Sequence, residues 1–102
     1  MAAVAYFLAL TIHLHLPDNG SLKGKRSELL AVKAALARRF GASVAEVDHH
    51  DLWQRSTLAA GLVGASIKDL ERAEAGLERY LDNRFPEGFR IDRRLVSFSD
   101  LN

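Results

Sequence analysis

The sequence predicts an α+β sandwich, in which an antiparallel sheet carries two helices on one face. Three observations lead to this class: two segments with a helical period, four segments with the character of strands, and their order along the chain, strand–helix–strand–strand–helix–strand. The chain has 102 residues, of which 48% are hydrophobic and 26% charged, as in an ordinary globular protein. We therefore expect one thin domain over residues 1–102.

The first strand is expected over residues 4–16, where apolar residues come to alternate with polar ones. This period of two is typical of a strand with one buried face. The apolar set is Leu10, Ile12, Leu14 and Leu16, and the polar set is Thr11, His13 and His15. The segment is shorter than the roughly 20 apolar residues of a membrane span. The turn formers at 17–20 are expected to end the strand.

Each expected helix begins at a capping serine and carries one apolar stripe. Ser21 is placed to cap a helix that runs to about Phe40, with Gly41 as a left-handed C-cap. Ser66 and Asp69 form the start of a second helix, which ends at 85–88. The stripes are Leu22, Leu29, Val32, Leu36 and Phe40, and then Ile67, Leu70, Ala73, Leu77 and Leu81. A single stripe indicates that each helix packs on one sheet face.

Three further strands are expected over 43–49, 56–64 and 89–98, with a connector at 50–55. Two split βαβ units of this size predict the ferredoxin-like sandwich. Its second sheet face is left open, and His13 and His15 are expected on that face. Since a thin domain often covers an open face by dimerising, a homodimer through this face is one expected assembly.

The net charge, the cysteine count and the absence of nucleotide-binding motifs exclude several classes of function. Net charge is +1, so any electrostatic partner must be met by a local patch. The absence of cysteine excludes disulfides, thiolate catalysis and cysteine zinc sites. No Walker-type or G-x-G-x-x-G run occurs, so we expect no cofactor. A cytoplasmic protein without a membrane partner is the default expectation.

The start of the first helix is basic, and it opposes the helix macrodipole. From 21 to 40 there are six basic residues and one acidic residue, Glu28. A helix N-terminus with cations around it is suited to an anion, and the phosphate of RNA is the ligand class that we expect. The alternative is that these cations solubilise an exposed helix. The candidate anion- or RNA-binding residues are Lys23, Lys25, Arg26 and Lys33.

A second cluster follows the strand over 43–49. Its residues are Asp48, His49, His50, Asp51, Trp53, Gln54 and Arg55. Imidazoles and carboxylates are suited to a metal site, to acid–base or hydrolytic chemistry, and to a hydrogen-bonded turn. Neighbouring strand residues face opposite sides, so His49 and His50 reach one ion only if the chain bends between them. No catalytic spacing accompanies them, so a binding protein is expected rather than an enzyme.

Trp53 has two interpretations, an anchor in the core or dimer interface and a platform for a nucleic-acid base. Ferredoxin-like RNA-binding domains place aromatic residues on their central strands. Here Phe7 could take that part, but the strand over 56–64 has no aromatic residue. This absence favours recognition of the RNA backbone or shape over stacking on bases.

Three motifs resemble the YlxP-like family, a bacterial family of unknown function. The motifs are His15-Leu16-Pro17, Ser21-Leu22-Lys23-x-Lys25-Arg26 and Val44-Ala45-Glu46-Val47-Asp48-His49-x-Asp51-Leu52-Trp53-Gln54-Arg55. The resemblance covers nearly the whole chain and implies a ferredoxin-like fold. Members are commonly encoded beside transcription and translation factors, including a ribosome-binding factor, which implies RNA or a ribosomal particle as partner by association. The family has no established activity and therefore implies no catalytic residue.

Overall fold

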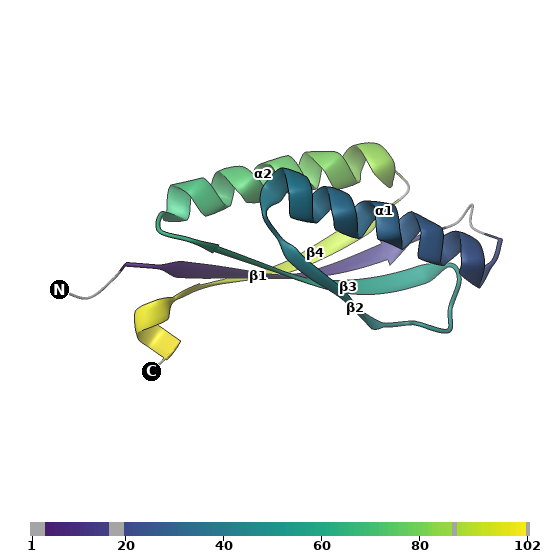
Figure 1. Cartoon of the computed structure of the whole chain (residues 1–102), viewed down its shortest axis with the longest axis horizontal. Coiled ribbons are helices and arrows are strands. Elements are labelled where there is room, and N and C mark those ends of the chain that lie inside the picture. The colour runs from purple at the N-terminus through teal and green to yellow at the C-terminus, as the bar shows by residue number, and fades with distance from the viewer. Residues whose placement is uncertain (1–3, 17–19, 87, 102) are drawn as a thin grey trace.

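A computed structural model describes residues 4–16, 20–86 and 88–101 of the chain (Figure 1). The elements follow in the order β1 (Tyr6–His15), α1 (Leu22–Phe40), β2 (Ser43–Asp48), β3 (Arg55–Gly64), α2 (Ile67–Arg84), β4 (Phe89–Ser97) and a 3-10 turn (Phe98–Leu101). The predicted order of strands and helices is confirmed, with most boundaries shifted by one or two residues. The turn expected at 17–20 falls mainly on residues 17–19, which lie outside the described residues.

The four strands form one antiparallel sheet in the order β2-β3-β1-β4. α1 and α2 both cover the same face of this sheet, and neither lies on the opposite face (Figure 1). The fold is therefore the ferredoxin-like α+β sandwich that the sequence predicts. The two central strands are paired along their whole length, from Tyr6 opposite Gly64 to His15 opposite Arg55. Paired residues project from the same face, so this register assigns each strand position to the helix side or the open side.

The core lies between the sheet and the two helices. Its buried apolar residues include Leu8, Leu10, Ile12, Leu14, Leu29, Val32, Leu36, Leu58, Leu62, Leu70, Leu77 and Leu81. Both predicted helix stripes are present except at their first residues, because Leu22 is 37% exposed and Ile67 is 39% exposed. Helical Cα–Cβ bonds tilt toward the N-terminus. The first side chain of a helix therefore points past its end rather than onto the sheet.

The predicted helix caps are confirmed. Ser21 Oγ accepts a hydrogen bond from the amide of Gly24 at 3.0 Å, and Ser66 Oγ accepts one from Asp69 at 3.3 Å. Gly41 ends α1 with a φ of 72°, a left-handed conformation that glycine adopts without steric cost. Within the described part of the chain, neither helix is long and apolar enough to cross a membrane.

Candidate functional site

On the two central strands, the open face of the sheet divides into an apolar half and a polar half. Ala9 and Gly61 are opposite each other in the apolar half, with Val63 further along β3. The Phe7 ring lies so close to Gly61 that an added Cβ would be 2.9 Å from ring atom Cε2. In the polar half, His13 is opposite Thr57 and His15 is opposite Arg55. The open face is therefore chemically different at its two ends.

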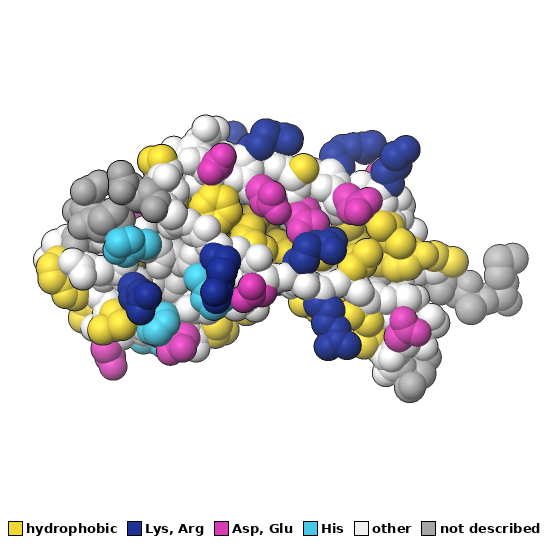
Figure 2. Space-filling view, turned by 180° about the vertical axis from the view of Figure 1, so that it is seen from behind, with side chains coloured by type: hydrophobic (Ala, Val, Ile, Leu, Met, Phe, Trp, Pro, Cys, Tyr) yellow, Lys and Arg dark blue, Asp and Glu magenta, His cyan; other side chains and the backbone are white. Residues whose placement is uncertain are grey.

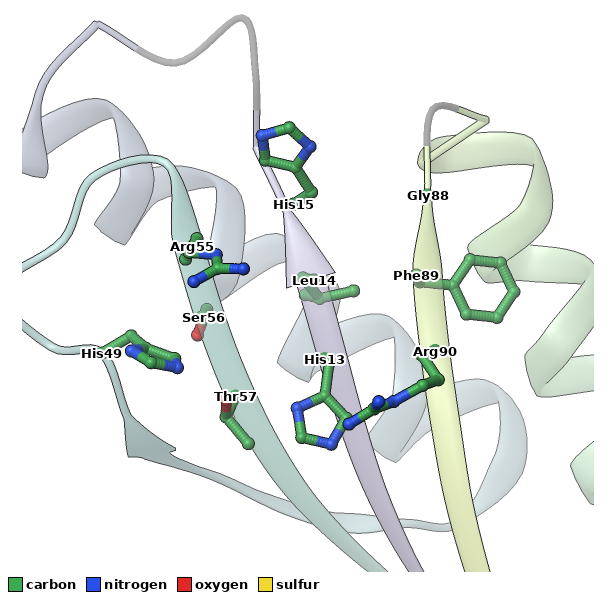
Figure 3. Close-up of a pocket in the computed structure, with 10 residues that line it drawn as sticks. All are labelled: His13, Leu14, His15, His49, Arg55, Ser56, Thr57, Gly88, Phe89 and Arg90. Atoms are coloured by element: carbon green, nitrogen blue, oxygen red, sulfur yellow. The ribbon is translucent and has the colours of Figure 1, made fainter.

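The polar half contains a depression with a volume of about 390 Å³ (Figure 3). Side chains from three strands and the β2–β3 connector meet there. Figure 3 shows the His13 ring beside Arg90, with His49 and Arg55 approaching from the β3 side. The lining residues are His13, Leu14, His15, His49, Arg55, Ser56, Thr57, Gly88, Phe89 and Arg90.

A carboxylate orients two of these side chains. Asp92 Oδ2 lies 3.0 Å from His13 Nε2 and 3.6 Å from Arg90 Nη2. Arg90 is directly opposite His13, and Asp92 is directly opposite Thr11, so the three groups share the open face. The hydrogen bond uses Nε2 of His13, which leaves Nδ1 as the ring nitrogen for a ligand.

Lys25 is buried. The basic helix start predicts a phosphate contact at this residue, and such a contact requires an exposed cation. Lys25 is 1% exposed, and it is the largest of the fully buried side chains among the described residues. Its Nζ donates hydrogen bonds to the carbonyl oxygens of His49 and of Leu52, the latter at 2.6 Å. The same ammonium lies 2.9 Å from Glu46 Oε2. These three oxygens occupy the three donors of a lysine ammonium, so Lys25 has no capacity left for a ligand.

The buried position of Lys25 has a signal in the sequence. Lys25 lies four residues before Leu29 and seven before Val32, both on the buried stripe of α1. A side chain at that spacing faces the sheet. The charge of Lys25 favours a place on the helix surface, whereas its helical phase places it inside.

A hydroxyl group also binds the Glu46 carboxylate of the ion pair between Lys25 and Glu46. Ser56 Oγ donates a hydrogen bond to Glu46 Oε2 at 2.7 Å. Burial by itself raises the pKa of Glu46, but the hydrogen bonds from Ser56 and Lys25 and the charge of Lys25 outweigh it, and the pKa is lowered from its ordinary value. Glu46 is therefore ionised at neutral pH. The ion pair holds the start of α1 against the end of β2.

The Lys25 contacts also determine where His49 lies. His49 has a φ of 64°, the one positive φ found outside glycine in the described chain. Left-handed geometry costs about 1–2 kcal/mol for such a residue. The register of β2 shifts between Glu46 and Asp48 just before it, and its amide donates to Asp48 Oδ1 at 2.7 Å. Strain of this kind is concentrated at functional sites.

The bend separates the two histidines instead of bringing them together. His49 lines the depression, whereas the Nε2 of His50 lies 3.2 Å from the carbonyl oxygen of Glu46. Across residues 4–16, 20–86 and 88–101, no group of three His, Cys, Asp or Glu side chains is placed to hold a metal ion. The arrangement is suited to an anion, because its fixed cations are Arg55 and Arg90.

Most of the remaining candidate residues lie on the surface at the same end of the molecule. Lys23 and Arg26 are exposed at the start of α1, whereas Lys33 is half-buried further along the helix. Trp53 is 41% exposed in the connector, so it is not a core residue of this chain. Asp51 and Gln54 are exposed beside it. Figure 2 shows histidine side chains interspersed with Lys and Arg at this end.

Sequence reasoning missed Thr57, Arg90 and Asp92. Arg90 and Asp92 alternate with Phe89 and Ile91, which pack against the core. This period of two placed both polar residues on the open face. Their proximity to His13 depends on the pairing of β4 with β1, which no local pattern contains.

These features define a ferredoxin-like α+β protein with a His- and Arg-lined depression on its uncovered sheet face. The chain belongs to the DUF503 family, described as "Protein of unknown function", whose model matches residues 7–93. It is similar to the uncharacterized protein YlxP of Bacillus subtilis (strain 168), with 31% identity over 70 residues, or 69% of this chain and 75% of that protein. The resemblance to the YlxP-like family is thereby confirmed.

Two solved structures share the fold. The de novo designed protein Foldit4 has a TM-score of 0.56 and 8% identity, over 90% of this chain and 96% of that chain. Protein SO0527 from Shewanella oneidensis has a TM-score of 0.53 and 17% identity, over 90% of this chain and 91% of that chain. At these identities the likeness concerns the fold alone.

Proposed function

We propose that this protein is a non-enzymatic RNA-associated protein, which contacts RNA phosphates with the cations at one end of the molecule. The observation that carries the proposal is the meeting of Arg55 and Arg90 with His13 and His49 on the uncovered sheet face. A guanidinium is a planar donor fork that matches a phosphate group. Ribosomal particles are the RNA-rich partner to test first.

Exposed cations at the start of α1 extend this contact. Lys23 and Arg26 flank the buried Lys25, whose hydrogen bonds tie the helix start to the β2–β3 connector. The connector also supplies His49 to the depression. The helix start and the depression are therefore held together, and one RNA segment can contact both.

The recognition that we propose is of the RNA backbone rather than of bases. Strand β3, Arg55–Gly64, contains no aromatic residue, and the Phe7 ring is packed against Gly61. Contacts to phosphates give affinity and orientation but little sequence information. We therefore expect binding that depends strongly on salt and weakly on sequence.

The test measures RNA binding and co-sedimentation with ribosomal particles at several salt concentrations. Lys23→Glu with Arg26→Glu, and separately Arg55→Glu with Arg90→Glu, should each weaken binding and lower the salt slope by about 0.7 per lost single-strand phosphate contact. The matched control is Arg72→Glu. Arg72 is 74% exposed and paired with Asp69 on α2, and its replacement should leave binding unchanged. Absence of binding at low salt would contradict the proposal.

A second candidate function is association between copies of this chain through the apolar half of the open face. Val63 of β3 favours it, since it is 64% exposed and has Phe7 opposite it on β1. Contiguous apolar surface of this kind often marks a protein contact. Such a dimer uses the opposite half of the face from the depression.

A further inference from the structure

We infer that the depression recognises a terminal phosphate monoester of RNA, at the 5′ or the 3′ end, rather than an internal phosphodiester. The inference rests on the proposed function and names the group that the site takes. It depends on three properties of the depression: its convergent shape, the limited extent of its charge, and the fixed orientation of its side chains.

The donors converge on one place instead of following a path. His13 has Thr57 opposite it on β3 and Arg90 opposite it on β4. Directly opposed residues of antiparallel strands have Cβ atoms about 4.5–5.5 Å apart. Arg55 and His49 line the same depression from the β3 side (Figure 3). These side chains line one depression, which has room for a single anionic group.

The positive charge is interrupted along the sheet. Beyond Thr11, the open side of the two central strands is uncharged, with Ala9 facing Gly61 and Phe7 facing Val63. On β4, the carboxylate of Asp92 lies between Arg90 and Arg94. A run of internal phosphates requires an unbroken run of cations, which Asp92 interrupts on this face. The charge is sufficient for one phosphate group.

A terminal phosphate fits that charge better than an internal one. A phosphate monoester carries about −1.5 to −2 at pH 7 and presents three acceptor oxygens, whereas a phosphodiester carries a single charge. Arg55 and Arg90 supply two positive charges, and the carboxylate of Asp92, 3.6 Å from Arg90, offsets part of them. His49 and Thr57 supply further hydrogen-bonding groups. The monoester therefore offers these groups more negative charge and more free oxygen atoms than a phosphodiester does.

Two of the side chains, those of His13 and Arg90, are held in place before a ligand arrives. Asp92 contacts both His13 and Arg90. Lys25 binds the carbonyl of His49, which stabilises its left-handed backbone. Fixing donors in advance reduces the entropy cost of binding. The buried Lys25 is thus a positioning residue for the depression.

The experiment compares one RNA oligonucleotide in three forms: with a 5′-phosphate, with a 3′-phosphate, and with hydroxyls at both ends. One phosphorylated form should bind about tenfold more tightly than the hydroxyl form, as expected for one added charge-assisted hydrogen bond. Arg55→Gln with Arg90→Gln should abolish this ratio. Lys23→Gln with Arg26→Gln should weaken all three forms equally and preserve it.

A second pair of variants tests the histidines. His49→Asn removes the imidazole but retains a residue that tolerates a positive φ, and it should reduce the preference. His50→Asn is the matched control, because His50 contacts the Glu46 carbonyl. Thermal melting confirms that each variant is folded. A preference unchanged by Arg55→Gln with Arg90→Gln would place the terminal phosphate elsewhere and overturn the inference.

A direct titration separates this inference from the proposed function. A nucleoside 5′-monophosphate and a nucleoside 3′-monophosphate are each added to the protein, and amide NMR shifts are recorded. Shifts at His13, Thr57 and Arg90 would support the site even if longer RNA fails to bind. No shift at millimolar concentrations of either overturns the inference. Equal binding of all three RNA forms also overturns it, and leaves RNA association standing.

Discussion

Lys25 shows how a charged residue can be required inside a small core. Removing an ammonium from water is costly, and a buried ion pair often contributes little net stability compared with an apolar pair. Here the ammonium also binds two carbonyl oxygens of the β2–β3 connector. An apolar side chain fills the same space without making those contacts. The charge therefore determines the path of the connector.

Lys25→Met should be strongly destabilising. It leaves Glu46 without its cation and leaves the carbonyls of His49 and Leu52 without their donor. Breaking one side of a buried pair costs about 3–5 kcal/mol, which urea unfolding will measure. Lys23→Met, on the exposed surface of the same helix, is the control and should change stability by less than about 0.5 kcal/mol. Equal stability of the two variants would falsify this role for Lys25.

The Glu46 carboxylate makes stability depend on acid pH. Its pKa in the folded protein lies below the ordinary value of 4.5. Its contribution is therefore fully present above the unfolded pKa, and it is lost as the pH falls through the lower folded pKa. In urea unfolding between pH 3 and pH 7, wild type should lose more stability toward acid than Glu46→Gln does. Parallel curves would show that Glu46 is not the group responsible.

At the scale of elements, charged side chains connect neighbouring helices and strands at the edges of the core. Arg84 of α2 donates two hydrogen bonds to Glu28 of α1, at 3.2 and 3.0 Å. Glu28 raises the pKa of Arg84 above its ordinary value. Arg93 of β4 donates to Glu74 of α2 at 2.7 Å. These pairs fix α1 to α2 and α2 to the sheet.

The contact between the two helices requires a glycine. The Phe40 and Tyr80 rings meet edge to face with centroids 6.4 Å apart. A Cβ on Gly76 would lie 2.9 Å from Phe40 Cε1. Glycine in a helix interior costs about 1 kcal/mol relative to alanine. Because glycine has no side chain at this position, Phe40 can lie against α2.

Gly76→Ala should lower the free energy of unfolding. The gain in helix propensity is about 1 kcal/mol, but overpacking typically costs 1–3 kcal/mol, so the clash with Phe40 is expected to prevail. In a Phe40→Ala background the clash is absent, and the same substitution should be stabilising. Urea unfolding of all four proteins forms a double-mutant cycle. A stabilising Gly76→Ala in wild type would contradict the packing argument.

At the scale of the whole molecule, the two faces of the sheet differ in what they carry. The helix side holds the core. The open side has a polar end that holds the depression and an apolar end that includes Val63. A dimer through the apolar end would leave the depression of each copy accessible.

Light scattering over a range of protein concentrations tests this dimer. Wild type should move toward twice the monomer mass as concentration rises, and Val63→Glu should remain monomeric, because a buried unpaired carboxylate is costly. Leu30→Glu is the matched control. Leu30 is 67% exposed on α1, close to the 64% of Val63, but it lies on the helix layer. Monomeric wild type at every concentration would rule this assembly out.

Local patterns in the sequence determined the elements and most of their faces. The alternation in β1 and the capping residues Ser21, Gly41 and Ser66 depend on neighbours within a few residues, so no tertiary information is needed to interpret them. The family followed from short motifs in the same way. The helical phase of Lys25 is also present in the sequence, although a lysine is rarely buried unless it is paired.

Only the tertiary structure decided which polar and charged residues meet. The depression joins His13, His49, Arg55 and Arg90, residues that are distant in sequence and meet through the strand order β2-β3-β1-β4. The left-handed turn at His49 accompanies the hydrogen bond from Lys25, a contact across 24 residues. Such pairings depend on the packing energy of the whole domain, which no window of the sequence contains.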